Sequence, residues 1–384
     1  MIRKNSLRAI GGLCLLALAL AGCATKPSGT AAHASSQPTA PAVPEKDRVL
    51  WQYHTALEAM RKGDYAIAKS NLDGAIARIS NILGKDESAR KSRGYFHQEA
   101  NKTFIGEPYE RAMAYYYRGI LYWMDGEIDN ARACFRSAEL EDSDAVEKKY
   151  SSDYVLLDYL DGFASLKLAG DGSDAFKRAT EVARISAPPP YNPKANVMLF
   201  VDFSGGPLKY AAGKYHELLM FRHGPDQARS VQIQIDGQTY QVRPYDNLYF
   251  QATTRGGRVM DQILANKARF KEGTDVGGDA ALITGGVLTT TGQSEAQYAG
   301  LGLMAAGLIS KIVSASTKPA ADTRTWSNLP LYLSFAAFEL PPGQHTATVD
   351  FLDEQNRKIS GLTKTVKFEV TSGTDKVIYV SDKS

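Results

Sequence analysis

A change in hydrophobic period near the middle of the chain constrains the fold more than any other feature. In the first half, apolar and small residues recur at the three- and four-residue spacing of α-helices, whereas the second half contains short stretches that alternate as β-strands do. Three consecutive prolines, residues 188–190, lie at the change, and proline ends a helix because it lacks the amide proton and clashes with the preceding turn. The sequence therefore predicts an α+β protein of two domains, a helical one over residues 46–187 and a β-rich one over residues 194–384.

Stretches of the helical half share a pattern in which small residues recur where two helices approach closely and a glycine turn separates them. The positions are Gln52, Ala56, Ala59, Gly63, Tyr65, Ala68, Leu72 and Ala75 in the first copy, and Tyr115, Gly119, Tyr122, Gly126, Ile128, Ala131, Phe135 and Ala138 in the second. A weaker third copy has its turn at Gly170. The pattern resembles the tetratricopeptide repeat. Because the turn glycines are 63 and 44 residues apart, against about 34 in a regular array, we predict an irregular helical-repeat domain.

The sequence of residues 103–111, Thr-Phe-Ile-Gly-Glu-Pro-Tyr-Glu-Arg, is distinctive and runs directly into the second copy. Together they resemble a family of bacterial lipoproteins with tetratricopeptide-like repeats whose function is uncharacterised. The resemblance covers the helical half well and the rest loosely. It implies a fold and no activity.

Helical repeats usually bind a partner through the inner face of each first helix. The candidate partner-binding residues on that face are Tyr53, Leu57, Tyr116, Ile120 and Trp123. Apolar and aromatic side chains of this kind supply the anchors of protein interfaces and suit an apolar peptide or helix. The alternative is that the interruption at residues 83–108, or the β-rich domain, already covers this face.

The first 22 residues have the composition of a secretory signal peptide, with three basic residues before an uncharged apolar run that is short for a membrane span. Residues 20–23, Leu-Ala-Gly-Cys, resemble the lipobox of bacterial lipoproteins, which implies cleavage before Cys23 and acylation of that residue. Ala24 stands where an aspartate would retain a lipoprotein in the inner membrane, which implies the outer membrane in a bacterium with two membranes. The alternative is an ordinary signal peptide that ends in a cysteine.

Residues 23–45 are rich in Ala, Ser, Thr and Pro, and we predict a flexible linker because they hold few large apolar side chains. Loss of the signal peptide removes three basic residues and leaves 42 Lys and Arg against 42 Asp and Glu. A net charge near zero argues against a nucleic-acid-binding protein. With Cys14 removed and Cys23 acylated, Cys134 remains, and its apolar helical surroundings predict a buried structural thiol.

Short stretches of the second half have the composition and spacing of β-strands. They lie at residues 197–201, 231–235, 239–242, 331–338, 346–351, 365–370 and 376–380. Asp236 and Gly237 form a two-residue hairpin signal between two of them. This spacing predicts an antiparallel β-sandwich, and residues 340–353 resemble the immunoglobulin-like modules of secreted bacterial proteins.

A stretch rich in Gly, Ala, Thr and Leu, residues 276–316, interrupts the predicted strands. Its most apolar part, residues 299–313, is shorter than the roughly 20 residues that span a bilayer. We predict a helical insertion packed on the sandwich. The alternatives are contact with a membrane or a partner through its small residues, and a loop.

No pattern in the sequence is typical of an active site. Residues 300–305 match the loose dinucleotide fingerprint, but no buried strand precedes them. The six histidines are scattered without metal-ligand spacing, and no Gly-x-Ser-x-Gly elbow occurs. We therefore expect no catalytic residue, no metal and no cofactor.

The leading hypothesis is a non-catalytic outer-membrane lipoprotein that faces the periplasm and acts as a scaffold or accessory factor in cell-envelope assembly. Its partners would be envelope proteins and, through the lipid anchor, the membrane, but not nucleic acid. A second hypothesis makes residues 276–316 a membrane-perturbing or oligomer-forming element. A third is a cell-wall glycan enzyme, because the paired carboxylates of such enzymes need not be close in sequence.

Overall fold

The computed structural model describes residues 43–84, 103–143, 151–214, 216–225, 227–254 and 320–384. Helices and several β-sheets occur together in them, so the α+β class is confirmed. The expected signal peptide, Cys23, most of the linker and the insertion at residues 276–316 lie outside the described residues. The expectations for those stretches stay predictions.

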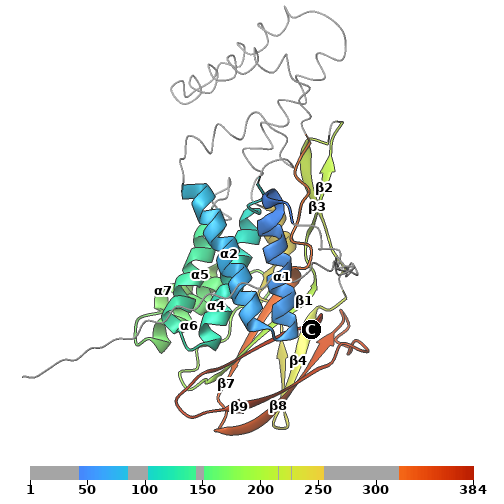
Figure 1. Ribbon diagram of the computed structural model, residues 1–384. Helices are drawn as coiled ribbons and strands as arrows, with labels where there is room; N and C mark the ends of the chain where they lie inside the picture. Colours follow the sequence, from blue (N-terminus) through green and yellow to red (C-terminus); the bar gives the residue numbers. More distant parts are fainter. Residues whose placement is uncertain (1–42, 85–102, 144–150, 215, 226, 255–319) are drawn as a thin grey trace, which may run out of the picture. The chain divides into compact units, whose positions relative to one another are not determined.

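Helices fill the first half and lie in pairs joined by short turns (Figure 1). After the short 3-10 turn η1 (Glu45–Asp47), the pairs are α1 (Arg48–Lys62) with α2 (Tyr65–Gly84), α4 (Pro108–Met124) with α5 (Ile128–Asp142), and α6 (Val155–Lys167) with α7 (Ser173–Glu181). Gly119 lets α4 approach α5 closely, because a Cβ at this position would lie 2.6 Å from the ring of Phe135. Each glycine expected at a turn lies between two helices.

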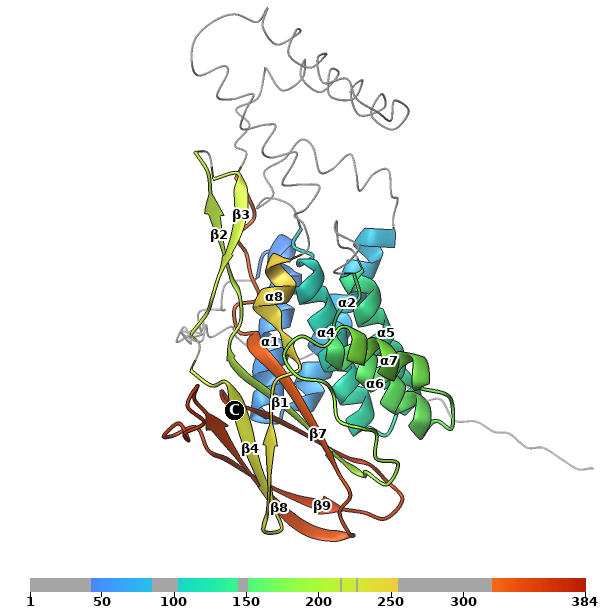
Figure 2. The same cartoon turned by 180° about the vertical axis from the view of Figure 1, so that it is seen from behind.

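The described strands of the second half form three sheets, ordered β10–β1–β7–β6, β5–β4–β8–β9 and β2–β3. Their bounds are β1 (Val197–Gly205), β2 (Leu208–Ala212), β3 (Leu218–Arg222), β4 (Ser230–Ile235), β5 (Gln238–Val242), β6 (Asp246–Asn247), β7 (Pro330–Phe338), β8 (Gly343–Leu352), β9 (Lys364–Val370) and β10 (Lys376–Ser381). A short helix, α8 (Leu248–Thr253), follows β6 and packs against β3 (Figure 2).

The first sheet is mixed, which corrects the expectation of wholly antiparallel strands. β1 pairs antiparallel with β7 but parallel with β10. The parallel pair arises because the chain passes through the second sheet after β7 and returns to the opposite edge of β1, the kind of crossover that parallel neighbours require.

Strand β1 separates two hydrophobic cores. Val197 and Leu199 pack with the second sheet, whereas Met198 and Phe200 on the opposite face pack with the helices, as the alternation of a strand requires. The core between the helices and the first sheet contains side chains from α1, α4, α6, β1, β7 and β10. Among the described residues, the helical half and the β-rich half belong to one compact unit and share this core.

Candidate functional site

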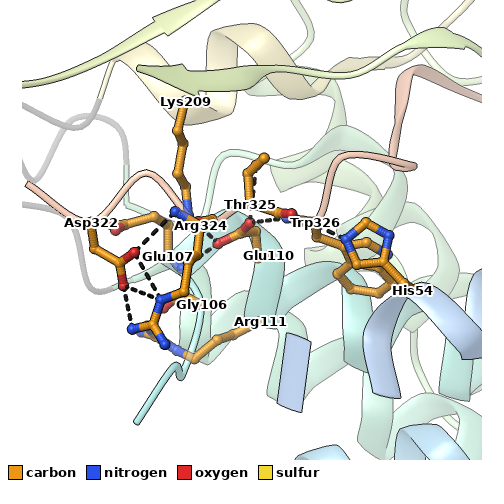
Figure 3. A network of polar contacts seen from close by, with 10 residues as sticks. All are labelled: His54, Gly106, Glu107, Glu110, Arg111, Lys209, Asp322, Arg324, Thr325 and Trp326. Carbon is orange, nitrogen blue, oxygen red and sulfur yellow. Dashed lines mark hydrogen bonds and ion pairs between the residues drawn. The ribbon is translucent and has the colours of Figure 1, made fainter. Parts of the chain in front are cut away.

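The distinctive segment at residues 103–111 leads into α4 and lies at the centre of a buried polar network (Figure 3). Gly106 has φ +80°, and a Cβ there would meet the side chain of Glu110 at 3.2 Å, so this position requires glycine. Glu107 caps α4 and Pro108 is its first residue, where the missing amide proton costs nothing. The Glu107 amide donates to the Glu110 carboxylate at 2.7 Å, as part of a capping box.

The Glu110 carboxylate joins three parts of the chain. Besides the Glu107 amide, it accepts hydrogen bonds from Lys209 Nζ in β2 at 2.6 Å and from the Trp326 amide at 2.7 Å. Both members of the ion pair are buried, with side-chain exposures of 0% for Glu110 and 1% for Lys209. Lys209 Nζ also donates to the carbonyl oxygen of Arg324 at 3.0 Å. We call this set of contacts the Glu110 junction.

The segment before β7 is held around the junction by further contacts. The Arg324 guanidinium pairs with Asp322 and with Asp47, each at 2.6 Å. The Trp326 ring stacks on Tyr53 of α1 with the ring centroids 4.2 Å apart. The junction therefore fastens η1, α1, the start of α4, β2 and the segment before β7 to one another.

The arrangement suits a structural joint better than a reaction. The ion pair is closed to solvent, so neither charged group meets a dissolved substrate. Within the described ranges, no group of three or more His, Cys, Asp and Glu side chains is placed to hold a metal ion. A cavity of about 140 Å³ lies elsewhere, beside Asp153, Arg184 and Asp246.

Another buried carboxylate lies between the helices and the first sheet. Asp202 of β1 accepts hydrogen bonds from the hydroxyls of Tyr117 at 2.5 Å and Tyr379 at 3.0 Å. Burial raises the pKa of Asp202 to about 7, against the lowering effect of these hydrogen bonds. Burial likewise raises the pKa of Asp246 to about 7, although its carboxylate accepts from the first two backbone amides of α6 at 2.9 Å.

The residues expected to bind a partner are all buried. Tyr53, Leu57, Tyr116, Ile120 and Trp123 have exposed fractions of 0 to 1%. The β-rich half covers them, since Tyr116 contacts the Phe200 ring of β1 and Trp123 Nε1 donates to Asp375 at 3.1 Å. This packing corrects the expectation of an open docking face and corresponds to the alternative in which the β-rich half covers it.

Cys134 lies half-buried on α5. Burial raises the pKa of its thiol to about 11, so little thiolate forms at neutral pH and the residue is a poor nucleophile.

The outer face of the β2–β3 hairpin carries an apolar row. Tyr210 lies directly opposite Met220, and Leu218 lies opposite Ala212, so these side chains share one face of the hairpin. Tyr210, Leu218 and Met220 are 40%, 39% and 43% exposed. We call these three residues the hairpin row. They form an exposed apolar surface next to the Glu110 junction.

The inner face of the same hairpin is fastened to the rest of the molecule. Lys209 reaches Glu110, and the Phe221 ring packs on Tyr109 with the centroids 6.0 Å apart. This hairpin was not predictable from the sequence, because residues 218–221 form a short continuous apolar run without the alternation that identifies a half-buried strand.

These features define the class of the protein as an α+β unit in which paired helices pack on one face of a mixed sheet and a second sheet packs on the other. No protein-family model, no curated protein and no solved structure matches the chain. Among the residues described, no helix combines the length and the apolar character needed to cross a membrane.

Proposed function

We propose that this protein is a non-catalytic lipoprotein that acts by contacting other proteins of the cell envelope. In this proposal Cys23 carries the lipid anchor, residues 24–45 tether the folded unit, and the protein faces the periplasm from the outer membrane. The helix pairs are irregular tetratricopeptide-like repeats, and the two four-stranded sheets are a sandwich. The partners are envelope proteins, and neither nucleic acid nor a cofactor takes part.

The observation that supports this proposal best is the hairpin row. The hairpin is held from its inner side by a buried ion pair, while three large apolar side chains are exposed on its outer side. Clustered apolar side chains on the surface of a soluble unit mark interaction sites more often than isolated ones do. The aromatic helical face, by contrast, is covered. We therefore assign partner contact to the hairpin and not to the helical repeats.

A triple substitution tests the assignment. Tyr210→Ser, Leu218→Ser and Met220→Ser together remove the row, and the matched control replaces three exposed apolar residues elsewhere, Ile67, Leu140 and Leu168, by serine. Because interface anchors contribute more than about 1 kcal/mol each, we expect cross-linking to envelope proteins in cells to fall at least about tenfold for the hairpin variant. The control should cross-link as the parent does. Equal cross-linking by both variants would contradict the proposal.

The anchor is tested separately. Cys23→Ser removes the acylated side chain, and we expect the protein to move from the membrane fraction to the soluble fraction. Retention of this variant in the membrane fraction would show that another element holds the protein there.

A second candidate function is oligomer formation or membrane perturbation by residues 276–316, and the observation that favours it is that described residues on both sides of this stretch contact the hairpin. On one side α8 packs against β3, and on the other the Ala321 amide donates to the carbonyl oxygen of His216 in the hairpin loop at 2.8 Å. Deleting residues 276–316 separates the candidates. A folded product that keeps its envelope cross-links would argue against the second.

A further inference from the structure

We propose that the cavity beside Asp153 and Asp246 binds the primary ammonium group of an aliphatic amine. The cavity is lined by other residues than the hairpin row, so this site goes beyond the proposed function. The proposal rests on the lining of the cavity, on a buried carboxylate oxygen without a partner, and on the excess of negative charge around it.

The cavity lies where the start of α6, the segment after α7, strand β6 and helix α8 meet. Its volume of about 140 Å³ is enough for one small organic molecule. Val155, Val182 and Ile185 contribute apolar wall, and Ile185 is 40% exposed, which places it toward the opening. Asp153 and Asp246 are each 3% exposed. An apolar wall with a few buried polar groups is typical of a site for a small molecule.

Asp153 has a carboxylate oxygen that can accept a further hydrogen bond. Its Oδ2 accepts from Arg184 at 3.1 Å, but its Oδ1 is buried and has no hydrogen-bond partner among the described residues. A buried acceptor without a partner costs free energy, so a donor bound in the cavity is stabilised there. Asp246 has capacity as well, because each of its oxygens accepts one helix amide at 2.9 Å and has a second lone pair.

Negative charge exceeds positive charge around the cavity. In the part of the chain that the structure describes, two carboxylates line it against one guanidinium, that of Arg184. Both carboxylate oxygens of Glu139 and one of Asp158 are also buried without a hydrogen-bond partner there. Burial raises the pKa of Glu139, and the nearby charges of Asp158 and Asp246 raise it further, so these carboxylates form one cluster with the cavity.

The arginines of this region are already paired with carboxylates. Arg178 of α7 pairs with Asp158 at 2.8 Å, and Arg184 pairs with Asp153 at 3.1 Å. The arginine side chains are 50% and 43% exposed, so water screens their charges more than it screens the buried carboxylates. An anion in the cavity would therefore be repelled by two buried carboxylates, whereas a cation would be attracted.

A primary ammonium group fits this lining better than a metal ion. It donates three hydrogen bonds, which can go to separate acceptors, and the alkyl chain that carries it suits the apolar wall. Protein sites for Ca²⁺ and Mg²⁺ bring several oxygen ligands to one point, and no three His, Cys, Asp or Glu side chains in the described ranges are placed to do so. The ammonium group can belong to a free amine or to a lysine side chain of a partner protein.

Calorimetric titration of the full mature chain at pH 8 tests the site. The probe is n-butylamine, and the controls are 1-butanol and butyrate, which have the same chain length without the positive charge. We expect the amine to bind at least about tenfold more tightly than the alcohol, because hydrogen bonds between charged groups are stronger than neutral ones, and we expect no binding of butyrate. Equal affinities for the amine and the alcohol would overturn the proposal, as would tighter binding of butyrate or of Mg²⁺.

Two variants locate the binding in the cavity. Asp153→Asn keeps the size of the side chain but removes its charge, and Ile185→Trp fills the opening while both carboxylates stay in place. Each should weaken binding of n-butylamine at least about tenfold, whereas the control Asp174→Asn on the exposed side of α7 should bind as the parent does. Urea unfolding shows which variants fold, and if Asp153→Asn does not, Ile185→Trp decides. Parent-like binding by a folded cavity variant would overturn the proposal.

Lysine blocked at both ends, N-acetyl-lysine N-methylamide, distinguishes the two sources of the ammonium group. Affinity equal to that of n-butylamine supports a lysine side chain of a partner protein, and affinity at least about tenfold lower supports a free amine. These titrations use the purified protein alone. Their failure therefore differs from failure of the proposed function, which is measured as loss or retention of envelope cross-links.

Discussion

Lys209 and Glu110 are the residues whose loss should affect folding most directly. Lys209→Met keeps the length of the side chain but leaves the Glu110 carboxylate buried without its cation. Breaking a buried pair in this way costs about 3–5 kcal/mol, so we expect the free energy of unfolding in urea to fall by that amount. The control is Lys62→Met, which removes the exposed pair with Glu58 on α1 and should leave the free energy of unfolding unchanged within error. Similar effects of both substitutions would contradict the burial of the junction.

Asp202 should make stability depend on pH. Its folded pKa of about 7 is above the ordinary value of 3.8, so between these values the folded state keeps a proton that the unfolded state releases. The stability linked to Asp202 is therefore complete below about pH 4 and is lost as pH rises to about 7, by up to roughly 4 kcal/mol.

The measurement is urea unfolding at pH 5 and pH 8. We expect Asp202→Asn to lose less stability than the parent between these pH values, whereas Asp129→Asn on the exposed side of α5 should lose as much as the parent. A parent-like pH dependence in Asp202→Asn would contradict the assignment to Asp202.

The sequence marked residues 103–111 as distinctive without indicating their role. The capping box is local and could be recognised, because Glu107 and Glu110 are three positions apart. The partners of Glu110 could not, since Lys209 and Trp326 lie 99 and 216 residues further along the chain.

Among the secondary-structure elements, the contact between α4 and α5 depends on a glycine. At Gly119 a Cβ would lie 2.6 Å from the fully buried ring of Phe135, so the ring or the helix would have to shift to admit it. Gly119→Ala should therefore destabilise the protein by about 1–3 kcal/mol, although alanine favours helices. Gly74→Ala in α2 is the matched control, because its Cβ meets only the flexible end of Gln52. Thermal unfolding of both variants checks the prediction, and a neutral Gly119→Ala would contradict it.

Elements with a local signal were predictable. Asp236 and Gly237 form the expected turn between β4 and β5, with φ of 52° and 79°, and the flanking strands pair around it. The β2–β3 hairpin was missed because its apolar run lacks alternation. The parallel pairing of β10 was missed because it depends on a crossover through the other sheet, which no local pattern encodes.

For the whole molecule, the main outcome is that the helices and the first sheet share one core. Tyr116 contacts Phe200, and Tyr117 contacts Tyr379, across the boundary between the halves. Helices end with α7 and strands begin with β1, where the sequence changes period, but the sequence could not show the shared core, because an apolar helix face has the same periodicity whether a partner or another part of the chain covers it. The shared core removes the helical face from consideration as a docking surface and leaves the hairpin row as the candidate.

Native-state hydrogen exchange, measured on peptides from α4 and β1, tests the shared core most directly. If the two halves are one cooperative unit, the amides of both elements should exchange through the same opening, with a free energy equal to that of global unfolding in urea. Exchange of the α4 amides through an opening of lower free energy, while the β1 amides stay protected, would contradict the shared core. It would mean that the helices separate from the sheet and expose Tyr116 and Trp123 to a partner.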